Sequence, residues 1–425
     1  MGRTGDMGQT ISEKILSAKA GRPVRAGEVV VCDLDIALGT DGSTPMALDY
    51  FDAMGGQAVR HPERIVFALD HYAPSPNAKT SALHRRMRAF AARHGIALHE
   101  VGEGIGHQLV VETGRAWPGA LTVGADSHAV TYGALNAFGT GIGSSDLAAA
   151  LISGRMWLKV PASIRVTLTG ALPRGVYPKD AALALANLLR ADGATYQALE
   201  FDGEGAAWLD LEDRLVLSNL SIEMGAKAGL FQADGKTAAY LEGRTRRAFT
   251  PVVPDPDATY AGDIVLDLSA LGPRIALPHQ VDNVVAIEQA AGVPIGMVAL
   301  GTCTGGRARD FHQARDVLMA GGGPAPGVQL VVTPASREVL AQLTRDGTLS
   351  DFIAMGAVIV TPGCGSCCGT CGAIPESGVN VISTANRNFK GRMGNGEAAI
   401  YLASPAACAA AAVRGRISDP REIVT

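Results

Sequence analysis

Apolar runs and amphipathic stretches alternate along the 425-residue chain. Five of the apolar runs stop abruptly at a small polar cluster, and they are EVVVCDLD (28–35), RIVFALDH (64–71), LTVGADSH (121–128), PIGMVALGTC (294–303) and AVIVTPGC (357–364). A short apolar run of this kind is typical of a strand that is buried on both faces of a parallel sheet. We therefore predict buried parallel strands in these five segments.

Stretches with helical periodicity lie between these runs, and the clearest are residues 10–20, 77–94 and 178–189. This alternation predicts an α/β fold in which helices flank parallel-rich sheets. The chain is longer than one hydrophobic core usually supports. Soft boundaries near Val160 and Pro278 predict three α/β domains, of residues 1–160, 161–280 and 281–425. The Pro-rich stretch 250–263 is predicted to be an ordered connection.

The charge balance is mildly acidic, with a formal net charge of -4 and a pI near 6.2. Because the chain lacks a broad basic field, we expect no nucleic-acid partner and no binding to an anionic membrane. No apolar run approaches the roughly 20 residues that span a bilayer, and the first residues lack the apolar core of a secretory signal. A cytoplasmic protein is the resulting expectation.

The cysteines point to a metal site. Cys364 and Cys367 form a C-x-x-C pair in TPGCGSCCGTCG, and Cys303 ends a different predicted strand 61 residues earlier. This spacing lets two thiolates reach one metal ion or neighbouring irons of one cluster. A cluster held by only three thiolates leaves one iron free to bind a hydroxyl and a carboxylate as a Lewis acid. The sequence therefore predicts catalytic chemistry rather than electron relay.

Two other interpretations of the cysteine-rich segment stay open. A zinc site would use all four of its cysteines, although four-cysteine zinc sites usually separate their two pairs by a longer segment. A thioredoxin-like redox motif would leave Cys303 and the histidine motifs unexplained. Cys32 and Cys408 lie in apolar or Ala-rich segments and are predicted to be inert core residues.

Histidines and carboxylates gather where predicted strands end. Dehydration of a hydroxy acid needs a base for a carbon-bound proton and an acid that assists the departure of hydroxide. Asn219 and Glu223 are four apart in a helix-like segment and would share a face. Ligands of open α/β sheets bind outside the carboxyl ends of the strands, which predicts one shared site. The further candidates in LDHYAP, GIGHQ and GADSHA are Asp70, His71, His107, Asp126 and His128.

The segment TANRNFKGR places Arg387 and Arg392 five apart, beside Asn386. Guanidinium groups match carboxylates bidentately, so this segment is a candidate clamp for an anionic substrate. The alternative is a surface loop with ordinary charges.

Two further features are predicted to be structural. The segment GTGIGS (139–144) has Ser144 where a dinucleotide loop needs Gly, and we interpret it as a turn that packs close to the site. His279 stays undecided. Five other histidines lie in charged or helical stretches and are predicted to be solvated, and they are His61, His84, His94, His99 and His312.

In this set of motifs the chain resembles the large subunit of the isopropylmalate dehydratase/homoaconitase group, within the aconitase superfamily. The resemblance runs from MGQTISEKILSAKAG through LDHYAP, GADSHAVTYGAL, SNLSIEMGA and ALPHQVDN to PGCGSC and STANRNFKGRMG, in the family's order and approximate spacing. It covers nearly the whole chain and implies an aconitase-like arrangement of three α/β domains. It also suggests Met7 as the natural start.

The resemblance implies a role for each candidate residue. A [4Fe–4S] cluster would be bound by Cys303, Cys364 and Cys367. The acid–base groups around the departing hydroxyl would be Asp70-His71 with His107 and Asp126, and His128 with Glu223. Substrate and cluster-bound water would be positioned by Asn219, Asn386, Arg387 and Arg392.

Aconitases of this superfamily also have a swivelling final domain that brings a serine base and further arginines, and this chain ends before such a segment. The resemblance therefore implies a separate small subunit and a small di- or tricarboxylate substrate. The implied activity is the reversible dehydration of a malate-type acid, foremost 3-isopropylmalate in leucine biosynthesis. Homocitrate or homoaconitate, a dialkylmalate and maleate are alternative substrates. An iron-sensing, RNA-binding protein and a zinc-stabilised structural protein are alternatives of other classes, and the mild acidity disfavours the first.

Three departures from the family pattern bear on the substrate more than on the reaction. Gly305 follows Cys303-Thr304 where the family usually has Asn. The segment 40–45, TDGSTP, replaces a TSP-type segment. Cys368 and Cys371 are additional thiols that the resemblance leaves without a role.

Overall fold

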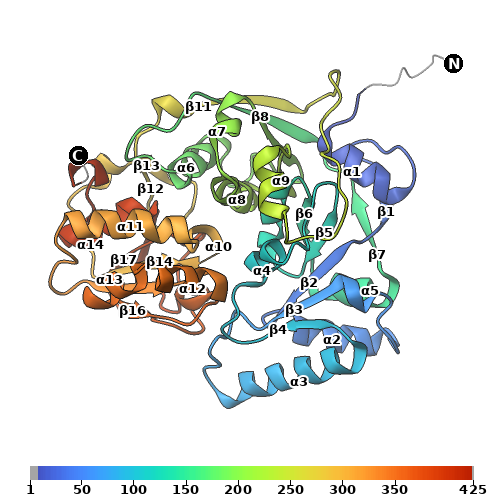
Figure 1. Cartoon of the computed structure of the whole chain (residues 1–425), viewed down its shortest axis with the longest axis horizontal. Coiled ribbons are helices and arrows are strands. Elements are labelled where there is room, and N and C mark those ends of the chain that lie inside the picture. Colours follow the sequence, from blue (N-terminus) through green and yellow to red (C-terminus); the bar gives the residue numbers. More distant parts are fainter. Residues whose placement is uncertain (1–7, 424–425) are drawn as a thin grey trace.

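The computed structural model describes residues 8–423. In this part of the chain, helices pack on three main sheets (Figure 1). The C-terminal third, orange to red, lies on the left of the view and the N-terminal third, blue to cyan, on the right. The parallel-rich sheets with flanking helices confirm the predicted fold class. The division into three domains stays a prediction, and Met7 lies outside the described residues.

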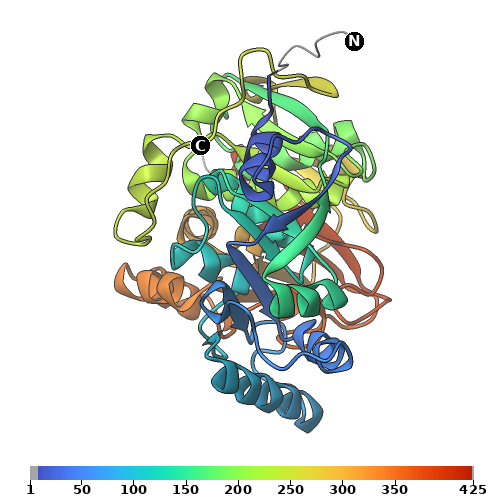
Figure 2. The ribbon, with the colours of Figure 1, turned by 90° about the vertical axis from the view of Figure 1, so that its right-hand side faces the viewer.

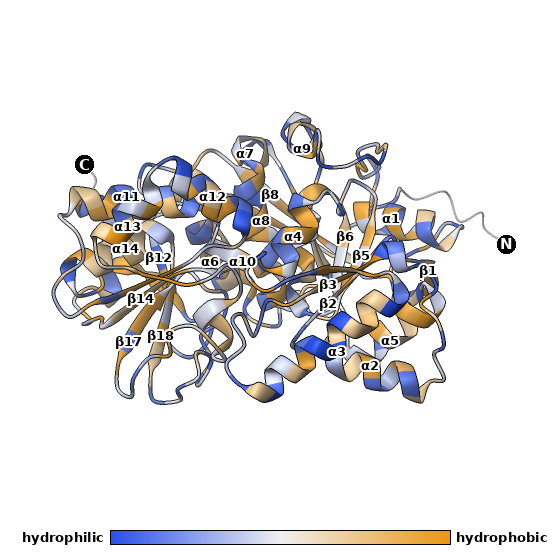
Figure 3. Ribbon diagram, turned by 60° about the horizontal axis from the view of Figure 1, so that its bottom comes forward, coloured by the Kyte–Doolittle hydropathy of each residue, from blue (hydrophilic) through white to orange (hydrophobic). Residues whose placement is uncertain are grey.

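The first sheet is parallel throughout, in the order β4, β3, β2, β5, β6. Its strands are β2 (Ile36–Thr40), β3 (Ile65–Ala68), β4 (Ala97–His99), β5 (Leu121–Gly124) and β6 (Phe138–Gly141). Successive residues of β2 enter two different cores, Ala37 on one face and Leu38 on the other, so the strand is apolar throughout. One face is covered by α2 (Thr44–Ala53), α3 (Ala78–His94) and α5 (Ser144–Ser153), and the other by α4 (Gly106–Glu112) and the 3-10 segment η2 (Ser127–Leu135) (Figure 3).

The second sheet is also parallel, in the order β10, β9, β8, β11. Its strands are β8 (Ser163–Thr169), β9 (Ala198–Asp202), β10 (Ala228–Phe231) and β11 (Gly262–Asp267). Ala198 and Leu230 belong to the core of the first sheet, which joins the two sheets. The accompanying helices are α6 (Pro178–Leu189), α7 (Glu204–Trp208), α8 (Leu211–Leu220), η3 (Ser221–Met224), α9 (Gly235–Leu241) and η4 (Leu268–Ala270).

The third sheet has the order β13, β12, β18, β17, β14, β15, β16, and only the pairings of β12 are antiparallel among its described strands. Its strands are β12 (Arg274–Ala276), β13 (Val284–Ala286), β14 (Met297–Gly301), β15 (Gln329–Thr333), β16 (Val358–Ile359), β17 (Asn380–Ser383) and β18 (Ala399–Ala403). The helices of this region are η5 (Ile287–Ala290), α10 (Thr302–Gly305), α11 (Ala308–Ala320), α12 (Arg337–Arg345), α13 (Thr348–Ala354), η6 (Gly365–Cys368), α14 (Pro405–Arg414) and η7 (Pro420–Glu422).

The first predicted strand is wrong in its pairing and burial. Residues 29–33 form β1 (Val29–Asp33), which pairs antiparallel with β7 (Arg155–Lys159) and has every second residue exposed. Val29 and Val31 face solvent with exposed fractions of 64% and 59%, so the apolar sequence conceals the alternation of a one-sided strand. In the last predicted strand, residues 357–364, only the short edge strand β16 forms. The other three predicted strands are confirmed as β3, β5 and β14.

The predicted helices are confirmed, and local capping explains where they begin. In α1 (Ile11–Ala20), Thr10 and Glu13 form a reciprocal capping box, and Gly21 ends the helix in a left-handed conformation. Asn77 caps α3, and Pro178 begins α6. Figure 2 shows α1, in blue, against the green middle third of the chain. The buried Glu200 of β9 accepts hydrogen bonds from the two backbone N–H groups at the start of α1, those of Ile11 and Ser12.

The connection 250–263 is ordered, as predicted. Its Asp255 donates a backbone hydrogen bond to Gln9, and Val252 donates one to the side chain of Asn136. The short 3-10 segment η1 (Pro62–Arg64) precedes β3. None of the helices within residues 8–423 is long and apolar enough to cross a membrane.

Candidate functional site

Three thiols face one cavity of about 70 Å³. Cys303 lies in α10, directly after β14, and Cys364 and Cys367 lie at η6, shortly after β16. β14 and β16 both pair in parallel with β15, so their carboxyl ends open at the same edge of the sheet. The cavity is lined by residues from the N-terminal and C-terminal parts of the chain, and most of them are polar: His71, Ile105, His107, Asp126, His128, Thr302, Cys303, Cys364, Cys367, Asn386, Arg387 and Arg392.

Side-chain N–H groups donate to two of the three sulfurs. Asn219 Nδ2 and Asn386 Nδ2 lie 3.2 and 3.1 Å from Cys303 Sγ, and Arg392 Nη2 lies 3.3 Å from Cys367 Sγ. Such donors stabilise a sulfur that carries negative charge. Burial raises the pKa of Cys303 to about 11, so its thiolate needs a nearby cation. Three convergent sulfurs with N–H donors behind them fit an iron–sulfur cluster.

Gly305 is explained by packing. A Cβ atom at this position would lie 2.6 Å from Cβ of Thr384, which is too close for a real contact. The hydroxyl of Thr384 accepts a hydrogen bond from the backbone N–H of Gly301 at 2.9 Å, so this side chain is fixed. Thr384 therefore occupies the space that a larger residue at position 305 would need.

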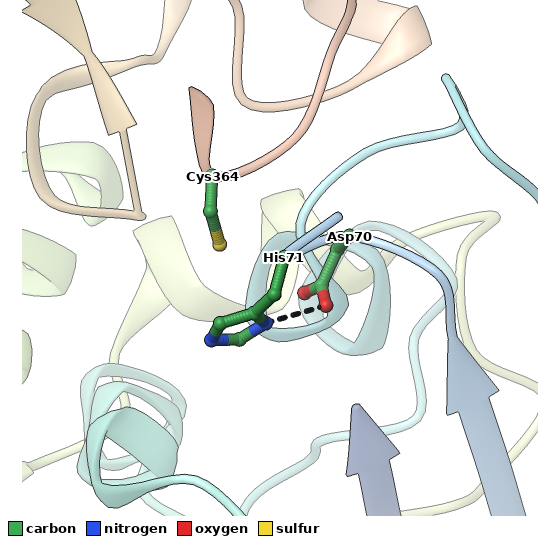
Figure 4. A group of neighbouring side chains, drawn as sticks. All are labelled: Asp70, His71 and Cys364. Carbon is green, nitrogen blue, oxygen red and sulfur yellow. Dashed lines mark hydrogen bonds and ion pairs between the residues drawn. The ribbon is translucent and has the colours of Figure 1, made fainter. Parts of the chain in front are cut away.

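His71 lies between two carboxylates, and Figure 4 shows it with the first of them, Asp70, and with Cys364. Its Nδ1 is 2.8 Å from Asp70 Oδ1, and its Nε2 is 3.3 Å from Asp126 Oδ2. Asp70 is fully buried and also accepts a hydrogen bond from the backbone N–H of Gly106 at 2.7 Å. Burial alone would lower the pKa of His71, but Cys364 and the two carboxylates outweigh burial and hold this pKa well above its usual value. His71 is therefore placed to hold a proton beside the thiols.

Asp126 connects three histidines. Its Oδ1 lies 2.9 Å from His107 Nε2 and accepts a hydrogen bond from the backbone N–H of His128 at 2.8 Å. The other nitrogen of His107 lies 3.0 Å from the hydroxyl of Tyr132. Burial would raise the pKa of Asp126, but the histidines outweigh it and hold the pKa well below its usual value. Asp126 thus stays charged and orients the imidazoles around it.

A second network holds Arg387 at the cavity wall. Its Nε lies 2.8 and 3.0 Å from the two carboxylate oxygens of Glu223, and its Nη2 donates to Ser127 Oγ at 2.9 Å. Glu223 also bonds His128 Nε2 at 2.9 Å. Burial would raise the pKa of Glu223, but His128 and Arg387 outweigh it and lower this pKa.

Asn219 and Glu223 do not share one helix, because α8 ends at Leu220 and Glu223 lies in η3. The expectation of one helix face was therefore wrong. The two side chains still reach the same site, Asn219 at the Cys303 sulfur and Glu223 at Arg387. Together with Asp70 they lie behind the cavity wall, and the other predicted site residues line the cavity itself.

Asp41 and His84 support the His71 loop, and sequence reasoning missed both. His84 was predicted to be solvated, but it is 2% exposed and its Nε2 lies 2.8 Å from Asp41 Oδ2. Asp41 also accepts hydrogen bonds from the backbone N–H groups of His71 and Tyr72 at 2.8 and 3.1 Å. The altered segment 40–45 was the available signal for Asp41. The sequence around His84 carried no such signal, because its partner, Asp41, is distant in the sequence.

The segment 139–144 packs close to the site, as predicted, but as the end of β6 and the start of α5 rather than as a turn. A Cβ atom at Gly141 would lie 2.8 Å from Cα of Ser127, the residue that bonds Arg387. A cavity of about 380 Å³ lies on this side of Ser127, and its lining residues include no thiol and no imidazole. The chemistry of the described residues is therefore concentrated in the smaller cavity.

Cys368 and Cys371 do not line the cavity. Their sulfurs point to backbone oxygens, and a hydrogen bond from Cys368 lowers the pKa of Cys371 to about 7. Cys32 and Cys408 are buried in hydrophobic cores, as predicted. His279 is exposed.

The fold and the site define an α/β protein in which thiols, charged histidine–carboxylate pairs and arginines meet at the carboxyl ends of parallel strands. Residues 13–415 match the model of the aconitase family (aconitate hydratase). The homoaconitase large subunit of Thermus thermophilus is 47% identical over 98% of each chain. The 3-isopropylmalate dehydratase large subunit 1 of Thermotoga maritima is 44% identical over 98% of this chain and 100% of its own length, and that of Methanopyrus kandleri is 43% identical over 98% and 99%.

Among solved structures, the holo-form of aconitase X from Thermococcus kodakaraensis aligns with a TM-score of 0.52 over 89% of this chain and 88% of its own. At 14% identity this likeness supports the fold alone. The family match and the full-length relatives also show the family and the class of reaction. The chain belongs to the aconitase family and is a hydro-lyase.

Proposed function

We propose that the chain is the large subunit of a [4Fe–4S] hydro-lyase that reversibly dehydrates a malate-type hydroxy acid, foremost 3-isopropylmalate. The observation that carries the proposal is the convergence of Cys303, Cys364 and Cys367 on the cavity that His71 also lines. A three-thiolate cluster and a charged imidazole in one cavity are the equipment that removal of hydroxide needs.

Residues of this chain take distinct parts in the proposed reaction. Bound at the three thiols, the cluster would supply a Lewis acid for the substrate hydroxyl and carboxylate. His71, between Asp70 and Asp126, holds the proton that the departing hydroxide takes up. Arg387 and Arg392 give the cavity wall positive charge for substrate carboxylates.

The base that removes the carbon-bound proton is assigned to a partner chain. This assignment is supported by the relatives, which are named large subunits and match this chain along nearly their whole length. We therefore propose that a small subunit completes the cavity, and that the large chain alone holds a cluster without turning over substrate.

Homoaconitate is the second candidate substrate. The relative that is 47% identical is a homoaconitase large subunit, whereas the 3-isopropylmalate dehydratases named above are 43% and 44% identical. The two substrates differ in the group attached to the four-carbon dicarboxylate core, a carboxylate-bearing chain against an isopropyl group. A substrate panel separates them.

The proposal is tested by anaerobic reconstitution. The large chain and its small subunit are co-expressed, loaded with iron and sulfide, and assayed with a panel of malate and citrate derivatives. We expect a cluster absorbance band, stoichiometric sulfide, and turnover of 3-isopropylmalate only when both chains are present. The Cys303→Ser variant is expected to lose the band and the turnover, whereas Cys408→Ser, in the hydrophobic core, should retain both. Zinc without sulfide, or no turnover of any derivative by the loaded pair, would overturn the proposal.

A further inference from the structure

Cys368 and Cys371 contact one and the same atom. The sulfur of each lies 3.2 Å from the backbone carbonyl oxygen of His71, to which its S–H donates. Because both sulfurs share this acceptor, they are separated by no more than twice that distance. The two thiols thus form a pair of their own, beside the three thiols that face the cavity.

The backbone between the two thiols turns back on itself. Gly369 has φ of 67°, and a Cβ atom there would lie 2.3 Å from the backbone nitrogen of Gly394. Only glycine combines this left-handed conformation with so close an approach. The turn brings Cys368 and Cys371 to the same side, with Thr370 Oγ1 donating to the same oxygen of His71 at 2.9 Å.

We propose that Cys368 and Cys371 are a thiol-modification site, which a low-molecular-weight disulfide converts into an internal disulfide while the cluster occupies the other three cysteines. A C-x-x-C pair joined by a tight turn meets the spacing that an internal disulfide needs. The cluster protects Cys303, Cys364 and Cys367, because a thiolate bound to iron is not free to attack a disulfide.

The reaction proceeds by two thiol–disulfide exchanges. Cys368 is partly exposed and Cys371 is buried, so R–S–S–R meets Cys368 first. The Cys368 sulfur attacks, breaks the S–S bond of R–S–S–R and releases RS⁻, which takes up the proton that Cys368 gives up. The Cys371 thiolate then attacks Cys368 Sγ, forms the Cys368–Cys371 bond and releases the second RS⁻. The two protein thiols lose two electrons and two protons in total, and R–S–S–R becomes two RSH.

The disulfide changes the support of His71. Oxidation removes both S–H donors from its carbonyl oxygen, and of the side-chain donors described here the Thr370 hydroxyl remains. His71 in turn lies between Asp70 and Asp126. We infer that turnover falls when the disulfide forms. This effect on turnover rests on the proposed function, whereas the disulfide itself rests only on the cluster at the other three cysteines and not on turnover.

The disulfide is tested on the cluster-loaded chain. The protein is incubated anaerobically with oxidised glutathione while cluster absorbance is monitored, free thiols are alkylated, and digested peptides are analysed by mass spectrometry. We expect a peptide in which Cys368 and Cys371 are linked and have lost two hydrogens. The Cys371→Ser variant should stop at a glutathione adduct on Cys368, and Cys368→Ser should leave the buried Cys371 reduced.

Two results would overturn the modification site. One is complete alkylation of Cys368 and Cys371 in the wild type, and the other is a disulfide to Cys364 or Cys367 while the cluster band persists. For turnover, the co-expressed pair should lose activity severalfold on oxidation and regain it with dithiothreitol, while Cys368→Ser/Cys371→Ser, which keeps a hydroxyl donor at both positions and cannot form the disulfide, keeps its activity under the same treatment. Unchanged turnover of the oxidised wild type refutes the effect on His71. A pair without any turnover refutes the proposed function. The mass spectrometry of the peptides then still tests whether Cys368 and Cys371 are the modification site.

Discussion

At the scale of single residues, the site depends on buried carboxylates whose charge is balanced by more than one partner. Glu223 bonds His128 on one side and Arg387 on the other, and it is almost completely enclosed. Removal of this charge would leave an imidazolium and a guanidinium without their common anion. The geometry of both groups at the cavity therefore depends on one carboxylate.

Glu223→Gln is expected to lower kcat of the reconstituted pair roughly 10²- to 10⁴-fold, the range of a lost acid–base group. The chain should still fold, because glutamine keeps the shape of the side chain. Steady-state kinetics with 3-isopropylmalate checks the prediction, and circular dichroism checks the fold. The matched control is Glu338→Gln, which also removes the carboxylate partner of an arginine, Arg244, at a residue that does not line the cavity. Turnover of Glu223→Gln equal to that of this control would contradict the assigned role.

At the scale of elements, helix α6 anchors the loop that carries Asn386 and Arg387. Lys179 is 3% exposed, and its Nζ donates to the carbonyl oxygens of Thr384 and Ala385 at 3.1 and 2.6 Å. Burial lowers the pKa of this lysine to about 8. The helix thus places a buried ammonium group directly under the loop.

The low pKa of Lys179 makes stability depend on pH in a defined direction. Between the folded-state pKa and the higher unfolded-state pKa, the unfolded chain binds more protons, so stability rises as pH rises through this window. From about pH 7 to about pH 9, the free energy of unfolding of the wild type should rise by roughly 1 kcal/mol relative to Lys179→Met. Urea denaturation at both pH values measures this difference.

The control for this prediction is Lys236→Met. Lys236 also donates to two carbonyl oxygens, those of Trp208 and Leu209, but it is partly exposed. Its difference from the wild type, measured at the same two pH values, is the reference for the loss of a lysine that donates to carbonyl oxygens at the surface. A difference for Lys179→Met that changes no more than this reference would show that the buried ammonium does not titrate in this window.

At the scale of the whole molecule, the cavity exists because the separate sheets are held together behind it. Arg307 is 2% exposed and joins α4 to α10. Its Nε donates to Gln108 Oε1 at 3.1 Å, and its Nη1 and Nη2 donate to the carbonyl oxygens of Thr304 and Cys303 at 3.0 and 2.9 Å. This one side chain therefore fixes the Cys303 loop against the first sheet.

Arg307→Met is expected to lower the free energy of unfolding by about 3 kcal/mol, because charged hydrogen bonds are lost and buried carbonyls are left unpaired. Arg244→Met is the control, since Arg244 also bridges distant segments but pairs with the exposed Glu338, and it should cost less than about 1 kcal/mol. Urea denaturation of both variants measures the two losses. Equal losses would mean that the buried contacts of Arg307 stabilise the chain no more than the exposed contacts of Arg244 do.

The sequence by itself determined the fold class, three of the five predicted strands, the helices with clear caps, and the groups of residues that form the site. These features are local: Thr10 with Glu13, or Cys364 with Cys367, are close in the sequence, and parallel strands bring their carboxyl ends to a common edge. Residue type and spacing were therefore enough to predict them.

Only the tertiary structure decided which surfaces are covered and which side chains become partners. Val29 and Val31 are apolar yet exposed, and His84 looks like a surface residue yet is buried against Asp41, because burial depends on segments that pack from far along the chain. The same reason applies to Cys371, whose acceptor is the carbonyl oxygen of His71, 300 residues away in the sequence. A hydrophobic run indicates that a segment packs in a core, whereas the packing of the whole molecule determines which atoms are in contact there.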